Sequence, residues 1–166
     1  MNDIPMIGIA ARGAGQGKTR LILALLEEFT RRGLKVAVLK HAQHVSWPAK
    51  KDSGLYMRHG ALSSLVVAPT GWQLSVAALE EPNFAAARDI LLQSCCANLL
   101  LTEGYKQGPQ PKLLLTEESA NEEVLLPHTV ALVSKAPQFL PLPCFSDEDT
   151  VGIVDFIIGY CGIGGK

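Results

Sequence analysis

The stretch Ala10-Ala-Arg-Gly-Ala-Gly-Gln-Gly-Lys-Thr-Arg20 decides the fold of this chain. An apolar run, Ile4 to Ile9, precedes it, and a helical pattern, Leu21 to Phe29, follows it. Glycines allow the backbone to turn tightly and to aim successive N–H groups at an anion, and a helix N-terminus adds unpaired N–H groups. The order strand, glycine-rich loop, helix therefore predicts a phosphate-binding loop.

The loop residues have separate expected tasks. Lys18 is expected to reach the terminal phosphates, and the Thr19 hydroxyl to bind Mg²⁺. The full pattern G-x-x-x-x-G-K-[ST] would place its first glycine at position 12, where this chain has Arg12. A glycine-rich turn that binds nothing is the competing interpretation, but Gly-Lys-Thr at a strand–helix junction favours phosphate binding. The residues predicted to contact the nucleotide in this loop are Gly13, Ala14, Gly15, Gln16, Gly17, Lys18, Thr19 and Arg20.

Length and composition indicate one globular domain over residues 1–166. The chain is 48% hydrophobic and 19% charged, which suits a buried core and argues against disorder. The formal net charge of −1 argues against a broad nucleic-acid-binding face. No apolar run is long enough for a membrane span, and Asp3 stands where a secretion signal carries basic residues. We therefore expect a cytoplasmic protein whose four cysteines are buried thiols.

Alternating strand and helix patterns predict the α/β class. We expect a P-loop NTPase-like fold, with a mostly parallel β-sheet flanked by helices in three α/β/α layers. An antiparallel pair is expected where a Pro-Thr-Gly turn separates two apolar runs, at 65–68 and 72–76. The other expected strands lie at 4–10, 35–39, 98–102, 112–116 and 130–133, and the expected helices at 19–32, 52–59, 80–94 and 147–160.

Polar groups follow three of the predicted parallel strands at their carboxyl ends, where ligands bind in open α/β sheets. Beyond the phosphate loop, Glu103 ends one strand and is expected to hold Mg²⁺ through water or to orient an attacking water. An ordinary exposed carboxylate is its alternative. Lys40, His41 and His44 follow another strand and are expected to contact phosphates or a second anionic ligand. A metal site with only two histidines, or a solvated basic loop, are the alternatives.

Base recognition stays open at this level. Ser134-Lys135 follows the strand at 130–133, where many GTP-binding P-loop proteins place a base-reading Lys and Asp. Here Ala136 and Pro137 come next, so the carboxylate that would read guanine is absent from this position. These residues do not decide between GTP and ATP.

Several segments together resemble the molybdopterin-guanine dinucleotide biosynthesis adapter proteins, the MobB family. The set of motifs in this order is far more specific than the phosphate loop alone. The matching segments are Gly15-x-Gly17-Lys18-Thr19, Val38-Leu39-Lys40-His41-x-x-His44, Lys51-Asp52-Ser53, Arg58-x-Gly60-Ala61, and Leu101-Thr102-Glu103-Gly104-Tyr105-Lys106 with Pro111-Lys112.

The resemblance implies a small homodimeric protein that binds GTP with Mg²⁺ and hydrolyses it slowly at most. It also implies a role beside a MobA-like nucleotidyltransferase and other molybdenum cofactor proteins, in attaching GMP to molybdopterin. Asp52 and Glu103 match the acidic positions of the family and are the candidate catalytic residues, while Thr19 and Glu103 are the candidate metal ligands. Asp52 has a simpler alternative as a helix-capping residue. The basic positions that match are Lys40, His41 and His44.

Departures from the family pattern keep two other functions open. Asn98 and Lys135 stand where the family often carries Asp, which bears on guanine preference and hydrolysis; the other departures are Arg12, Arg20 and Lys50. A small-molecule kinase would share the phosphate loop but usually needs an arginine-rich lid, and the segment 104–112 has no arginine. A non-catalytic interaction protein with a degraded nucleotide site is the third possibility.

Overall fold

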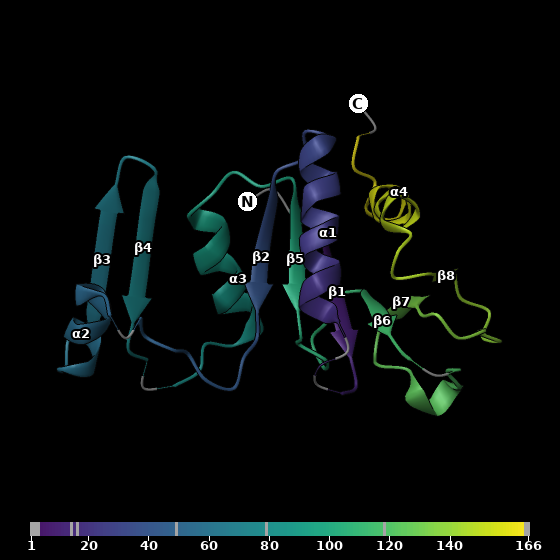
Figure 1. Cartoon of the computed structure of the whole chain (residues 1–166), viewed down its shortest axis with the longest axis horizontal. Helices are drawn as coiled ribbons and strands as arrows, with labels where there is room; N and C mark the ends of the chain where they lie inside the picture. Colours follow the sequence, from purple (N-terminus) through teal and green to yellow (C-terminus); the bar gives the residue numbers. More distant parts are fainter. Residues whose placement is uncertain are drawn as a thin grey trace. The chain divides into compact units, whose positions relative to one another are not determined.

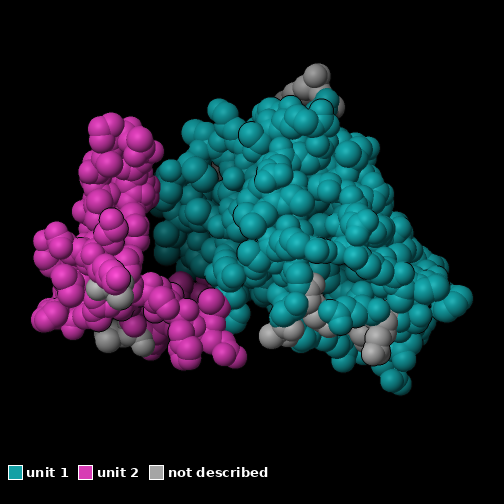
Figure 2. Space-filling view, viewed as in Figure 1, with its two compact units in different colours: residues 1–41, 86–166 teal, residues 42–85 magenta. Residues whose placement is uncertain are grey.

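The computed structural model describes residues 4–13, 15, 17–48, 50–78, 80–117 and 119–164. The residues form two compact units, 1–41 with 86–166 and 42–85, and each is considered by itself (Figure 2). A single domain over 1–166 stays a prediction. In chain order, the elements are β1 (Met6–Ala11), α1 (Lys18–Arg31), β2 (Val36–Lys40), α2 (Asp52–Arg58), β3 (Ser63–Ala68), β4 (Gly71–Val76), α3 (Phe84–Gln93), β5 (Leu99–Glu103), β6 (Lys112–Leu115), η1 (Glu122–Val124), β7 (Thr129–Val133), β8 (Cys144–Phe145) and α4 (Thr150–Cys161).

The first unit is built on a six-stranded sheet in the order β2-β5-β1-β6-β7-β8 (Figure 1). Every neighbouring pair is parallel. After β5 the chain crosses from one side of β1 to the other, where β6 lies. Such a reversal of strand order opens the crevice in which α/β proteins bind ligands. The phosphate loop leaves β1 at this point, so the topology places it in that crevice.

Helices α1 and α4 pack against each other and against β1. The apolar stripe of α1, including Leu25 and Phe29, is buried together with Ile153 and Ile157 of α4. Burying each such side chain stabilises the fold by about 1.5–3 kcal/mol. The α/β class, the parallel sheet and its flanking helices are therefore confirmed. A second apolar cluster combines residues of β1, β6 and β7 with the segment around η1: Ala10, Leu114, Ala120, Leu126 and Leu132.

The predicted boundaries shift most at two helix starts. α3 begins at Phe84 rather than position 80, and α4 begins at Thr150 rather than position 147. Asp149 sets the second boundary, because its side chain accepts a 2.9 Å hydrogen bond from the N–H of Gly152 and so caps α4. The two-residue strand β8 was not predicted. It is defined by its pairing with β7, which no local pattern reveals.

The prediction of buried thiols is wrong. Cys95, Cys96 and Cys144 are exposed, and Cys161 is half-buried. Cys95 and Cys96 lie beyond the last residue of α3, a helix without a fully buried side chain. Their position after the helix, rather than on an inward face, explains the exposure. Among the described residues, no helix combines the length and apolar character needed to cross a bilayer.

The second unit contains α2 and the antiparallel hairpin β3–β4, as predicted for the strand pair. Leu65 lies opposite Leu74, and Val67 lies opposite Trp72, so these four side chains share one face of the hairpin. All four are exposed. Ser75 belongs to the other face and is buried. The hairpin thus has one uncovered apolar face, which we call the apolar hairpin face.

Candidate functional site

Two glycines shape the end of the phosphate loop. Gly15 and Gly17 have φ angles of 77° and 75°, in the left-handed region that costs other residues roughly 1–2 kcal/mol. Gly17 is also the N-cap of α1, and no side chain among the described residues caps this helix start. The first N–H groups of α1 therefore point an uncapped positive end at the loop. Ala14 and Gln16, also predicted to contact nucleotide, lie outside the described residues.

Side chains from three elements meet at the carboxyl end of β5. The Thr19 hydroxyl of α1 donates a 3.1 Å hydrogen bond to Oε1 of Glu103. Nζ of Lys40, at the end of β2, lies 3.1 Å from the same oxygen. Lys40 is opposite Glu103 in the parallel register, so the sheet itself places these two residues together. Glu103 is only 8% exposed, which strengthens its interactions with both partners.

The segment after β5 is tied to both neighbouring loops. The backbone N–H of His41 donates to the Glu103 carbonyl at 2.9 Å, and the His41 ring centroid lies 5.0 Å from that of Tyr105. Tyr105 has a positive φ of 45°, uncommon for a residue with a bulky side chain. Lys106 Nζ donates to the Arg12 carbonyl at 2.5 Å. His41 is therefore brought to the site together with Tyr105 and Lys106.

The basic residues of the loop point in different directions. Nζ of Lys18 donates to the Gly13 carbonyl at 3.1 Å, which folds the ammonium back onto the loop. The Arg12 guanidinium donates to the carbonyl of Glu123 in η1, and the Arg20 guanidinium pairs with Asp147. Of these three side chains, Lys18 is the one that is hydrogen-bonded within the phosphate loop.

Two predicted residues belong to the other unit. His44 is exposed in the segment before α2, and Asp52 is the exposed first residue of α2. An acidic residue in the first helical turn is also favourable to the helix dipole by itself. His44 and Asp52 lie in the compact unit 42–85, and the roles predicted for them stay predictions.

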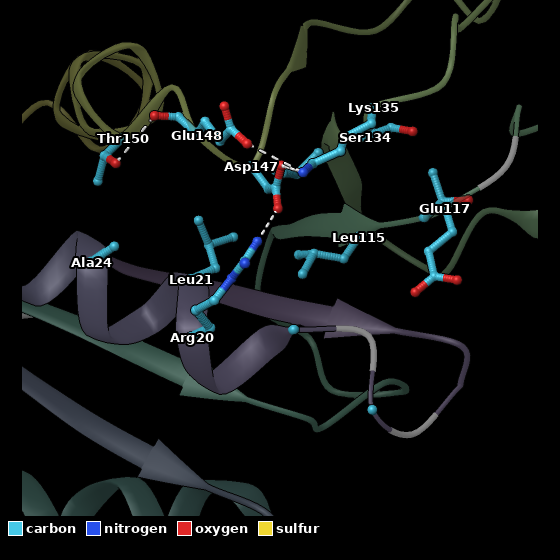
Figure 3. Close-up of a pocket in the computed structure, with 14 residues that line it drawn as sticks. Arg20, Leu21, Ala24, Leu115, Glu117, Ser134, Lys135, Asp147, Glu148 and Thr150 are labelled. Atoms are coloured by element: carbon cyan, nitrogen blue, oxygen red, sulfur yellow. Dashed lines mark hydrogen bonds and ion pairs between the residues drawn. The ribbon is translucent and has the colours of Figure 1, made fainter.

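A cavity of about 800 Å³ adjoins the phosphate loop (Figure 3). Near its centre, Asp147 pairs with Arg20 and lies 3.5 Å from Nζ of Lys135. The hydrogen bond from Lys135 to Glu148 and the charge of Asp147 raise the pKa of Lys135, which keeps it cationic. The cavity is lined by Gly15, Gly17, Arg20, Leu21, Ala24, Leu115, Thr116, Glu117, Val133, Ser134, Lys135, Asp147, Glu148 and Thr150.

Asp147 was missed in the sequence as a site residue. Position 147 is the expected start of the last helix, and an aspartate at a helix start has an ordinary structural role. The only available signal was the presence of carboxylates shortly after Lys135, and nothing local indicates that they face it.

The donor atoms near the loop suit a magnesium ion held partly by a ligand. Among the described residues, no group of three or more His, Cys, Asp or Glu side chains could hold a metal by itself. Mg²⁺ normally takes one or two protein oxygens and completes its octahedron with phosphate oxygens and water. The neighbouring oxygens of Thr19 and Glu103 fit this limited protein contribution.

Comparison with known proteins decides the family. The family model described as "MobB: Molybdopterin guanine dinucleotide synthesis protein B" matches residues 6–135. The chain belongs to the MobB family. The resemblance stated from the sequence is therefore confirmed.

Individual MobB relatives match over most of their length. The chain is 29% identical over 168 residues to the molybdopterin-guanine dinucleotide biosynthesis adapter protein of Escherichia coli (strain K12), covering 95% of this chain and 93% of the relative. It is 30% identical over 152 residues to the probable adapter protein of Bacillus subtilis (strain 168), covering 86% and 85%. The crystal structure of Bacillus subtilis MobB has a TM-score of 0.74 at 26% identity, over 98% of this chain and 100% of that one. Sequence and fold thus agree on MobB.

Proposed function

We propose that this MobB family member is a GTP-binding adapter in molybdopterin guanine dinucleotide biosynthesis, with at most slow GTPase activity. The observation that carries the proposal is the Thr19–Glu103 hydrogen bond beside the phosphate loop. It joins a loop hydroxyl to a strand-end carboxylate, the two groups that hold Mg²⁺ beside the phosphates in P-loop proteins.

Each residue of the site has a distinct task in nucleotide binding. The uncapped N–H groups after Gly17 donate hydrogen bonds to phosphate oxygens. The ammonium group of Lys18 leaves the Gly13 carbonyl and neutralises the terminal phosphates. Thr19 and Glu103 would hold Mg²⁺, which would neutralise part of the phosphate charge when it is bound. Lys40 partly balances the charge of Glu103 and holds its carboxylate at the end of β5. Together these groups bind and orient the triphosphate.

Slow turnover follows from what the site lacks. Fast hydrolysis in P-loop proteins generally needs an arginine that stabilises the transition-state charge. In this structure the guanidinium groups of the two arginines next to the loop lie against other partners, since Arg12 donates to the Glu123 carbonyl and Arg20 pairs with Asp147. We therefore propose that the nucleotide state, rather than rapid turnover, is what the protein presents to its partners.

The second unit supports a homodimer, which we propose to be cytoplasmic. An exposed apolar face is a typical interaction surface, and the four side chains of the apolar hairpin face are adjacent in register. A second copy of the chain is the occupant that we propose for it. The E. coli relative is named an adapter protein of molybdopterin-guanine dinucleotide biosynthesis. On that basis, we propose a MobA-like nucleotidyltransferase and other molybdenum cofactor proteins as further partners.

Calorimetry tests the proposed function directly. GTP and ATP are titrated into the chain with Mg²⁺ and with a chelator, and into the variants Lys18→Ala and Lys35→Ala. Lys35 is an exposed lysine after α1 and serves as the matched control. GTP is expected to bind the wild-type and Lys35→Ala chains, more tightly with Mg²⁺, and to lose most of its affinity for Lys18→Ala. Absence of binding by both nucleotides to the wild-type chain would sink the proposal.

A further inference from the structure

We propose that Asp147 reads the guanine base in the cavity beside the phosphate loop and so selects GTP over other nucleotides. The proposal rests on the proposed function, because a base occupies this cavity only when a triphosphate occupies the loop. It adds the residue that provides base specificity, which the phosphate loop itself cannot supply.

The cavity is placed and sized for a nucleoside. It begins at Gly15 and Gly17 and extends past the ends of β6 and β7 to the segment before α4 (Figure 3). A triphosphate held by the loop therefore has its ribose and base within reach of this space. The volume of about 800 Å³ lies within the range typical of small-molecule sites.

One carboxylate oxygen of Asp147 has only a distant donor. Its Oδ1 is shielded from solvent and accepts no close hydrogen bond within the described part of the chain. Its ion-pair partner, Nζ of Lys135, is 3.5 Å away, beyond ordinary hydrogen-bond distance, while Oδ2 is the atom paired with Arg20. A shielded acceptor held only by a long ion pair is poorly satisfied, so a ligand that supplies a closer donor is favoured.

The two neighbouring cations can move aside. The side chains of Arg20 and Lys135 are 72% and 62% exposed, so their pairing with Asp147 contributes little to stability. Turning toward solvent leaves both carboxylate oxygens of Asp147 open to a base. Arg20 and Lys135 thus pair with the Asp147 carboxylate until the base takes their place.

The chemistry of a carboxylate favours guanine among the common bases. Guanine presents two adjacent donors, N1–H and the N2 amino group, which match the two acceptor oxygens of Asp147. Adenine presents the N1 lone pair next to a single donor, so an acceptor would face an acceptor. A site built to accept hydrogen bonds discriminates strongly against ligands that lack the donors.

The fold replaces the residue that is missing after β7. Positions 136 and 137 are Ala and Pro, where a base-reading carboxylate is absent. The N–H of Ser134 donates to the Phe145 carbonyl at 2.8 Å, which fixes the segment after β8 beside the end of β7. This pairing brings Asp147 next to Lys135, although the two residues are 12 positions apart in the sequence.

Binding of base analogues to the full chain tests the assignment. GTP, ATP and xanthosine triphosphate are titrated by calorimetry into the wild-type chain, Asp147→Asn and Asp155→Asn. Asp155 is an exposed aspartate of α4 that does not line the cavity, and it is the matched control. Wild type and Asp155→Asn are expected to bind GTP at least about tenfold more tightly than ATP. Asp147→Asn is expected to lose at least about tenfold in GTP affinity and to gain about tenfold for xanthosine triphosphate, because xanthine has a carbonyl where guanine has its amino group.

The outcomes separate this assignment from the proposed function. Unchanged GTP affinity in Asp147→Asn overturns the role of Asp147, and so does a loss of GTP affinity without any gain for xanthosine triphosphate. A gain for xanthosine triphosphate cannot come from misfolding. If wild type binds GTP and ATP equally, nucleotide binding stands and the role of Asp147 fails. If wild type binds no nucleotide, both fail.

Discussion

The hydroxyl of Thr19 lies 3.1 Å from Oε1 of Glu103 and donates a hydrogen bond to it, across 84 positions of sequence. Thr19 stands in the first turn of α1, and Glu103 is the last residue of β5. Since β5 is the direct neighbour of β1, the strand order brings this acid beside the helix that follows the phosphate loop. Lys40 reaches the same carboxylate from β2 on the other side of β5. The proposed magnesium site is therefore a product of three adjacent strands.

Replacing Glu103 should separate the metal contribution from phosphate binding. Glu103→Gln keeps the size of the side chain but removes the charge that favours Mg²⁺. In the presence of Mg²⁺, we expect GTP affinity to fall about tenfold or more, because an interaction with a charged group typically contributes about 1.5–3 kcal/mol. In a chelator, we expect GTP affinity to change little. Calorimetry under both conditions measures this. Glu27→Gln, an exposed glutamate of α1, is the control, and an equal loss in the chelator would contradict a metal role.

The buried Lys112 should stabilise the loop after β5. Its Nζ donates to the carbonyls of Gly108, Gln110 and Pro127 at 2.6, 2.9 and 2.9 Å, and the side chain is fully buried. Lys112→Met leaves three carbonyls without this donor, including that of the buried Gln110, so we expect the free energy of unfolding to fall by about 1–3 kcal/mol. Urea denaturation measures the loss. Lys35→Met, at an exposed lysine, should change stability far less, and equal effects of both variants would show that the three bonds contribute little.

Acid should remove the contribution of Glu28 to stability. Hydrogen bonds from Arg31 and Arg32 lower the pKa of Glu28 from 4.5 to about 2. A carboxylate whose pKa is lowered by folding stabilises the native state above its ordinary pKa, and this contribution disappears as the pH falls toward the lowered value. The melting temperature of wild type should therefore exceed that of Glu28→Gln at pH 7 and approach it between pH 4.5 and 2.

A pH series of thermal unfolding experiments checks this expectation. Glu27→Gln removes a neighbouring exposed carboxylate and corrects for the change in net charge. The difference between wild type and Glu28→Gln should shrink on acidification. A difference in melting temperature that is constant from pH 7 to pH 2 would contradict the stabilising role of the ion pairs of Glu28 with Arg31 and Arg32.

The apolar hairpin face should determine the oligomeric state. Leu65→Lys puts a charge in the middle of this face, directly opposite Leu74. Burying an unpaired charge is costly, so we expect the variant to be a monomer at concentrations where wild type is a dimer. Sedimentation equilibrium gives the mass of each. Leu23→Lys changes an equally exposed leucine of α1 and should leave the dimer intact. A monomeric wild type would overturn the proposal that a second copy of the chain covers this face.

Local sequence alone determined the phosphate loop and the elements around it. The glycine spacing, the Gly-Lys-Thr sequence and the apolar periodicity of α1 act within short segments, so they could be interpreted without any distant contact. The apolar run at 98–102 predicted a buried strand with Glu103 at its carboxyl end for the same reason, and the structure has this strand as β5, Leu99–Glu103.

Only the tertiary structure decided which distant side chains meet. Lys40 lies against Glu103 because β2 and β5 are parallel neighbours in register. Asp147 pairs with Arg20, 127 positions away, because the short strand β8 joins the edge of the sheet and brings the next segment beside the start of α1. Neither contact could be predicted from the hydrophobic periodicity or the motif spacing of the sequence. The physical reason is that strand order, unlike strand formation, depends on long-range packing of the whole sheet.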